Sequence, residues 1–164
     1  MTDAEETIVI GMGEMSVARG DTTVLVCMGL GSCVALCVYD PVSRARGMAH
    51  IVLPQRNGRE DECSAKYADV AVPLLLREMH RSGTPLSRLV VKIAGGSKMS
   101  SAAGLNGIFQ IGERNVAAVR EAIAGAGIAL AAADTGGHRG RTVRMHPDLG
   151  RVVVTTLGQE SKEL

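Results

Sequence analysis

Aromatic side chains are nearly absent from this sequence of 164 residues, which contains no tryptophan, one phenylalanine and two tyrosines. The core must therefore be built from Val, Ile, Leu, Met and Ala side chains, which supply most of the 46% hydrophobic residues. With 21% charged residues, the composition matches ordinary globular proteins and excludes a disordered chain. The length fits one domain with a sizeable core.

The sequence also lacks an excess of either charge sign. It contains 18 Lys and Arg residues and 17 Asp and Glu residues, so its net charge is +1. This balance gives no field over the whole molecule that would attract nucleic acid or an acidic membrane surface. A basic stretch at residues 138–141, followed by Arg144, is more typical of a solvated turn. We therefore expect no nucleic-acid partner.

Long hydrophobic runs are missing as well, since no stretch approaches the roughly 18 apolar residues of a membrane span. Residues 1–7 are acidic and do not form an apolar leader. The sequence therefore predicts a cytoplasmic protein that does not insert into membranes. In that compartment the cysteines Cys27, Cys33, Cys37 and Cys63 are expected to be free thiols.

The cysteine spacing argues against a metal site. Cys33 and Cys37 are four residues apart in an expected strand, a separation of roughly 13 Å, which is too far for both thiolates to bind one zinc ion. Cys37 is predicted to be a core residue and Cys63 an exposed loop thiol without a role. The glycine motifs at residues 11–13 and 95–97 complete no nucleotide-binding pattern. No metal and no cofactor are expected.

The hydrophobic pattern predicts an α/β domain with a mixed sheet and at least two helices. Apolar residues recur at helical spacing over residues 66–81 and 112–125, and Pro73 is expected to kink the first helix or to mark a boundary in it. The tail at residues 159–164 is expected to be frayed. Apolar and β-branched runs predict strands at residues 8–10, 22–27, 33–39, 47–53, 89–94, 128–133, 141–146 and 151–156.

Cys33 directly follows a glycine turn at residues 29–32 and opens an expected strand. At such an element end, the backbone N–H groups of Gly31, Ser32 and Cys33 are not committed to a sheet and can face a developing oxyanion. Only the thiolate is reactive, so a base must lower the thiol pKa from about 8.5. His50, on the next and antiparallel strand, is the nearest candidate. A buried structural cysteine and a core histidine are the alternative interpretation of this pattern.

Further blocks surround these two residues in a fixed order along nearly the whole chain. They are GLGSCVA at residues 29–35, Asp40-Pro41, GMAHIVLP at 47–54, KYAD at 66–69, KIAGG at 92–96, IGERN at 111–115 and DTGG at 134–137. In composition and order these blocks resemble the chemoreceptor glutamine deamidase family, CheD.

The resemblance implies a single CheD-like domain over residues 1–164 that hydrolyses glutamine side chains of chemotaxis receptors to glutamate, with Cys33 as nucleophile and His50 as base. It implies a three-layer α/β/β sandwich with mixed sheets, similar to the catalytic domain of cytotoxic necrotizing toxins. The implied partners are the cytoplasmic helices of the receptors. An alternative role is that of an adaptor that acts mainly by binding a CheC-type phosphatase, with weak or no catalysis. A third interpretation is another thiol amidase, such as a peptidase or a transglutaminase.

The third catalytic position of the family lies six residues before the cysteine and holds a threonine, but this chain has Cys27 there. A thiol sulfur is only a weak hydrogen-bond acceptor. Cys27 therefore orients the histidine poorly, or Thr23 or Ser32 replaces it, or the third group matters little. If a side chain at this position orients His50, Cys27→Thr is expected to raise turnover.

Overall fold

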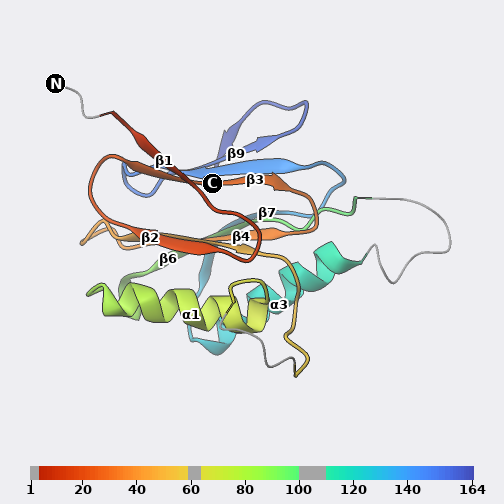
Figure 1. The fold of residues 1–164 in the computed structure, drawn as a ribbon, viewed down its shortest axis with the longest axis horizontal. Coiled ribbons are helices and arrows are strands. Elements are labelled where there is room, and N and C mark those ends of the chain that lie inside the picture. Colours follow the sequence, from red (N-terminus) through yellow and green to blue (C-terminus); the bar gives the residue numbers. More distant parts are fainter. Residues whose placement is uncertain (1–3, 59–63, 100–109) are drawn as a thin grey trace.

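The computed structural model describes residues 4–58, 64–99 and 110–164, which form three stacked layers (Figure 1). Helices α1 (Ala68–Arg81) and α3 (Ile111–Gly125) make up one outer layer. They cover one face of a five-stranded middle sheet, and a second five-stranded sheet packs on its other face. The predicted α/β class with mixed sheets is confirmed.

Both sheets contain parallel and antiparallel pairs. Among the strand pairs of the described residues, β6–β7 in the middle sheet and β1–β3 in the outer sheet are parallel, and the others are antiparallel. The turn of 3-10 helix η1 (Leu86–Arg88) precedes β6. The middle sheet has the order β2 (Met15–Ala18), β5 (Arg46–Ile51), β4 (Val34–Tyr39), β6 (Val90–Gly95), β7 (Leu130–Thr135). The outer sheet has the order β1 (Glu6–Val9), β3 (Thr23–Leu30), β8 (Arg141–Met145), β9 (Val152–Thr156), β10 (Lys162–Glu163).

Strand β4 lies between two hydrophobic cores and contributes side chains to both. Val34, Leu36 and Val38 pack into the core beneath the helices. Cys33, just before the strand, and Ala35 belong to the core between the two sheets. A strand that is buried on both faces appears in the sequence as a continuous apolar run, as residues 33–39 do. The alternation places the Cys33 side chain between the sheets.

The predicted strands and helices are found in the described residues, with ends that shift by a few positions. Strand β3 extends to Leu30, which pairs with Arg141, so the expected glycine turn begins only at Gly31. Helix α1 continues through Pro73 and has no boundary there. Pro73 is exposed, while the opposite face of the helix is fully buried, and burial of that face outweighs the missing backbone hydrogen bond.

Two short strands were not predicted. Strand β2 has four residues without a clear apolar alternation, and its pairing with β5 makes it a strand. Residues 159–164, expected to be frayed, instead include β10, which pairs with β9. The terminal Leu164 is held as well, because its N–H donates to the Val152 carbonyl at 2.9 Å and its carbonyl oxygen accepts from Lys92 Nζ at 2.5 Å.

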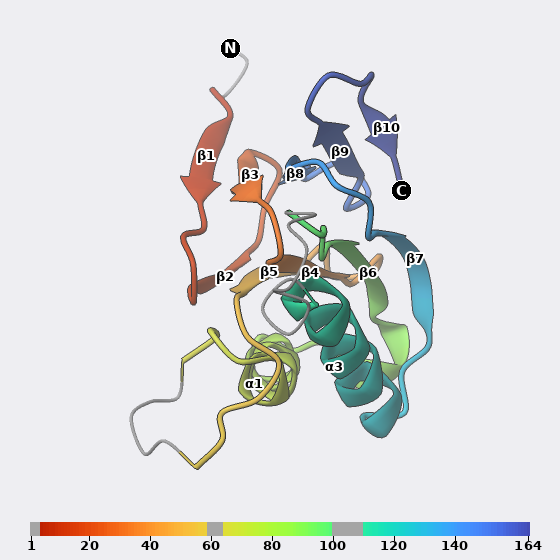
Figure 2. The same ribbon diagram turned by 90° about the vertical axis from the view of Figure 1, so that its right-hand side faces the viewer.

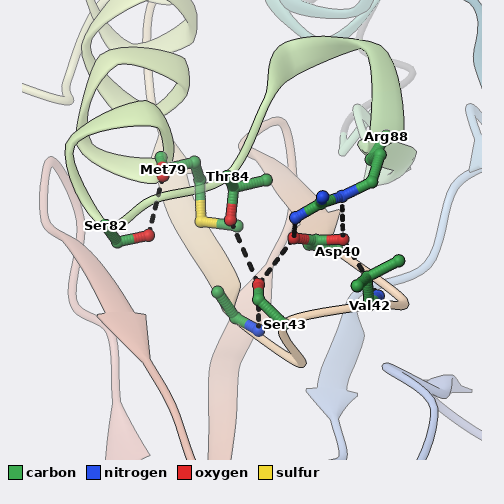
Figure 3. Close-up of polar contacts among 8 residues, drawn as sticks. Asp40, Val42, Ser43, Met79, Ser82, Thr84 and Arg88 are labelled. Carbon is green, nitrogen blue, oxygen red and sulfur yellow. Dashed lines mark hydrogen bonds and ion pairs between the residues drawn. The ribbon is translucent and has the colours of Figure 1, made fainter.

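A buried carboxylate closes the turn after β4 (Figure 3). Asp40 is fully buried and accepts hydrogen bonds from Arg88 Nε at 3.0 Å and from Arg88 Nη2 at 2.6 Å. It also accepts from Ser43 Oγ at 2.6 Å and from the Val42 N–H at 3.0 Å, and Ser43 Oγ lies 3.2 Å from Thr84 Oγ1. The Arg88 guanidinium, followed by the other donors, holds the pKa of Asp40 well below its usual range.

Replacing Asp40 with asparagine is expected to lower the free energy of unfolding at pH 7 by roughly 2 to 4 kcal/mol, because Arg88 loses its buried partner. The folded-state pKa is depressed, so the ionised carboxylate stabilises the fold above the unfolded-state pKa of about 4 and this contribution fades below it. The difference between wild type and Asp40→Asn should therefore be largest at pH 7, smaller at pH 3, and lost fully only below the depressed folded-state pKa. Urea unfolding at both pH values measures it.

Asp148 provides the matched control, because its side chain is 62% exposed and pairs with Arg151 at 3.2 Å on the surface. Asp148→Asn is expected to change stability by less than about 1 kcal/mol. A gap for Asp40→Asn that stays constant between pH 7 and pH 3 would contradict the lowered folded-state pKa of Asp40.

Candidate active site

Cys33 lies where the chain crosses from the outer sheet into the middle sheet. The outer-sheet strand β3 ends at Leu30, residues Gly31 and Ser32 form the turn, and β4 starts at Val34. Figure 2 faces this side of the molecule, where the β3–β4 connection, the end of β6 and the first turn of α3 come together. The Cys33 side chain is 8% exposed, so the thiol is close to the surface but largely shielded from water.

His50 lies on β5, directly opposite Ala35 of β4. Side chains of directly paired residues point to the same face of a sheet, and so do residues two positions apart in one strand. His50 and Cys33 therefore lie on the same face of the middle sheet, as diagonal neighbours across the β4–β5 pair. Diagonal neighbours are roughly 7 to 8 Å apart, which long side chains can bridge. The predicted juxtaposition of the two residues agrees with this register.

The imidazole of His50 is fixed by a backbone carbonyl. Nδ1 lies 3.0 Å from the Ile10 carbonyl oxygen, and His50 is 3% exposed. A carbonyl oxygen only accepts, so Nδ1 carries a proton and, in the neutral ring, Nε2 carries the free lone pair. Nε2 is buried and has no hydrogen-bond partner among the described residues. The backbone of His50 is held too, because its N–H donates to the Glu14 carbonyl at 3.0 Å and its carbonyl accepts from the Gly13 N–H at 2.9 Å.

The carbonyl groups of the Cys33 turn, residues 31–33, are each bound by a different donor. The Gly31 carbonyl accepts from the Ser97 N–H at 2.8 Å, and the Cys33 carbonyl accepts from the Gly96 N–H at 2.8 Å. The Ser32 carbonyl accepts from Asn115 Nδ2 at 2.9 Å. In the described part of the chain no acceptor from another residue engages the N–H groups of Gly31, Ser32 and Cys33. The turn thus has its carbonyls bound and its N–H groups available to an oxyanion.

Burial raises the pKa of the Cys33 thiol, and its own backbone N–H opposes that rise. The thiol is therefore mainly protonated near neutral pH unless a neighbouring base accepts its proton. The unpartnered Nε2 of His50, on the same face of the sheet, is a group of the required chemistry.

The remaining described thiols have no such environment. Burial, followed by the neighbouring Cys37 and Cys33 thiols, raises the pKa of Cys27 far above its usual range. Burial raises the pKa of Cys37 to about 12, which agrees with the predicted core position. Among the described residues, no hydrogen bond joins the His50 ring to the side chain of Cys27, Thr23 or Ser32. Cys63 lies outside the described residues.

A network on the other side of the turn holds the Gly96 and Ser97 donors in place. The buried Ser97 hydroxyl donates to the Arg139 carbonyl at 2.7 Å and accepts from Arg141 Nη1 at 2.6 Å. Arg141 Nη2 in turn donates to Asp134 Oδ1 at 3.2 Å. The glycine loop at residues 95–97 is therefore tied to β8 of the outer sheet and to β7 of the middle sheet.

Gly95 shows how tightly this loop packs on the backbone of Cys33. A Cβ atom at position 95 would lie 2.2 Å from the Cys33 carbonyl oxygen, and the residue has a φ of +120°. Only glycine fits both the contact and the backbone conformation.

Sequence analysis did not identify Asn115 or Arg141 as parts of the site. Asn115 lies in the buried stripe of α3 together with Gly112, Val119 and Ile123. A polar amide within an apolar helical stripe was the one available signal, since buried amides require partners. Its contact with Ser32 spans 83 positions of sequence, so no local pattern predicts it.

Other features of the described residues do not indicate a second kind of site. No group of three or more His, Cys, Asp or Glu side chains in them is arranged to hold a metal ion. A cavity of about 410 Å³ between α1 and α3, lined in part by Asp69 and Glu121, contains neither Cys33 nor His50. None of the helices in the described ranges is long and apolar enough to cross a membrane.

Residues 52–156 match the model of a protein family described as CheD chemotactic sensory transduction. The matched segment begins two residues after His50 and makes up more than half of the chain. The chain belongs to the CheD family.

Named relatives extend the similarity over nearly the whole chain. The "Chemoreceptor glutamine deamidase CheD" of Thermotoga maritima is 44% identical over 150 residues, which cover 92% of each chain. The protein of the same name from Halalkalibacterium halodurans is 38% identical over 161 residues, covering 97% of this chain and 99% of the relative. The "Probable chemoreceptor glutamine deamidase CheD" of Symbiobacterium thermophilum is 46% identical over 157 residues, covering 94% and 95%.

Proposed function

We propose that this chain is a protein-glutamine glutaminase, which hydrolyses glutamine side-chain amides of chemotaxis receptors to glutamate and releases ammonia. The observation that carries the proposal is the placement of a thiol at a turn with available N–H groups, on the same face of one sheet as an imidazole whose Nε2 has no partner among the described residues. The names of the relatives supply the substrate class. The likeness of the fold to the catalytic domain of cytotoxic necrotizing toxins stays a prediction.

The proposed reaction has two stages. His50 Nε2 accepts the Cys33 proton, and the thiolate attacks Cδ of the glutamine side chain to form a tetrahedral intermediate. The N–H groups of the Cys33 turn stabilise its oxyanion. The intermediate collapses as protonated His50 donates to the leaving nitrogen, and ammonia departs from the thioester. Water then gives a proton to His50 and attacks the thioester, which yields glutamate and returns the proton to Cys33.

Within this proposal the Ile10 carbonyl takes the orienting role that the family assigns to a threonine. It accepts from Nδ1 at 3.0 Å and so leaves Nε2 as the base, whatever the residue at position 27. The departure at Cys27 is then compatible with an active enzyme.

This contact changes the expectation for Cys27→Thr. Because Nδ1 already has an acceptor, the new hydroxyl should leave the deamidation rate within about twofold of wild type. If the threonine hydroxyl of the variant instead oriented the His50 ring, it would add one hydrogen bond, which would raise the rate by up to about tenfold. Steady-state ammonia release separates the two outcomes, and a tenfold gain would restore the side-chain explanation.

The proposed function is tested by incubating the protein with the cytoplasmic domain of a chemotaxis receptor. Mass spectrometry of receptor peptides should show amide-to-acid conversion at particular glutamines, with no backbone cleavage. Cleaved or cross-linked receptor would indicate a peptidase or a transglutaminase instead. An unmodified receptor, together with tight binding of a CheC-type phosphatase, would favour the adaptor role.

A further inference from the structure

Asn115 connects the strand of the nucleophile to the strand of the histidine. Its side chain is fully buried, and Nδ2 donates to the Ser32 carbonyl at 2.9 Å and to the Val52 carbonyl at 2.8 Å. Ser32 directly precedes Cys33, and Val52 is two residues beyond His50. One amide group on α3 therefore holds both sides of the candidate site.

This contact falls where the two strands separate. The last pair of the β4–β5 ladder at this end joins Val34 and Ile51. Val52, the residue after β5, donates its N–H to the Lys66 carbonyl at 2.8 Å instead of pairing with Cys33. The ladder thus stops one residue short of the nucleophile, and Asn115 bridges the two strands where it ends.

The orientation of the amide follows from its partners. Two carbonyl oxygens can be satisfied only by the NH2 group, which places Oδ1 on the other side. Oδ1 is buried and has no partner among the described residues. The unpaired buried Oδ1 is unfavourable, but an apolar residue at this position would remove the donor from both carbonyls.

We propose that Asn115 is a positioning residue that sets the distance and direction between the Cys33 thiol and the His50 ring. The inference rests on the proposed function for its catalytic consequence, but the geometry between thiol and imidazole is measurable without a substrate. When the bridge is lost, the turn at Gly31 and Ser32 moves relative to β5. Misplacement of reacting groups by about 1 Å reduces rates by up to about 100-fold.

Two variants test the inference. Asn115→Asp keeps the volume but replaces the NH2 donors with a carboxylate oxygen, and Asn115→Ala removes both donors and volume. We expect kcat for receptor deamidation to fall by roughly 10- to 100-fold in both variants, with KM changed much less, because substrate binding is not the affected step. We also expect the pH profile of Cys33 alkylation by iodoacetamide, followed by peptide mass spectrometry, to shift to higher pH because His50 no longer stabilises the thiolate.

Val119→Ala is the matched control, because Val119 lies one turn further along the same buried stripe of α3 and contacts the helix-side core. It should lower the urea midpoint of unfolding while leaving kcat and the alkylation profile at wild-type values. Asn115 variants that lose stability but keep the wild-type kcat and profile would overturn the positioning role. If wild type does not deamidate receptors, the proposed function fails, while a shifted alkylation profile in the Asn115 variants would still support the inference.

Discussion

Replacement of Cys33 with alanine is expected to reduce ammonia release by roughly 10⁴-fold or more, because no covalent thioester can form without the thiol. The fold should persist, since the substitution removes a single small side-chain atom at the edge of the core between the sheets. A coupled ammonia assay on a receptor cytoplasmic domain measures the rate. Circular dichroism and urea unfolding report whether the domain is still folded.

Cys37→Ala is the matched control, because Cys37 lies on the same strand and in the same core but is completely shielded, with burial raising its pKa to about 12. It should leave the rate close to that of wild type. Persistent ammonia release from Cys33→Ala would end the assignment of Cys33 as the nucleophile, whatever the control shows.

The second large effect is expected for His50→Gln, which should lower deamidation by roughly 10² to 10⁴-fold, the usual contribution of a general acid–base residue. Glutamine has no basic nitrogen, so the Cys33 proton has no acceptor, and iodoacetamide should alkylate Cys33 more slowly near neutral pH. Both the deamidation rate and the alkylation rate should therefore fall.

His80→Gln provides the comparison, because His80 is exposed in the last turn of α1. It should change neither rate. If His50→Gln alkylates at the wild-type rate, the thiolate is formed without His50 and a different base must be sought.

The strands that carry Cys33 and His50 could be predicted from the sequence, because both residues lie in or next to continuous apolar runs. Those runs identify β4 and β5, and the short connection between them predicts an antiparallel pair. The register is a different matter, because a shift of one residue would turn His50 to the helix side. Packing of the two cores selects the observed register, and no single strand contains that information.

The contacts that complete the site come from distant parts of the chain. The carbonyl that binds His50 belongs to Ile10, 40 positions away. Every residue has a backbone carbonyl, so the identity of residue 10 gives no sign of this contact. Strand β2, which returns from that carbonyl to pair with β5, was missed for its weak pattern. The third group of the site was therefore sought among side chains at Cys27, Thr23 and Ser32, whereas the structure offers a main-chain oxygen.

Because Ile10 follows β1 of the outer sheet and His50 belongs to the middle sheet, the contact between them joins the two sheets. The helix layer and the middle sheet share a core of their own, in which neither Ile10 nor His50 takes part. A partly unfolded form that kept this second core but released the outer sheet would retain its helices and its thiol, yet its imidazole would rotate freely. On the proposed mechanism, activity would therefore depend on the stacked sandwich as a whole and would disappear before helical content does.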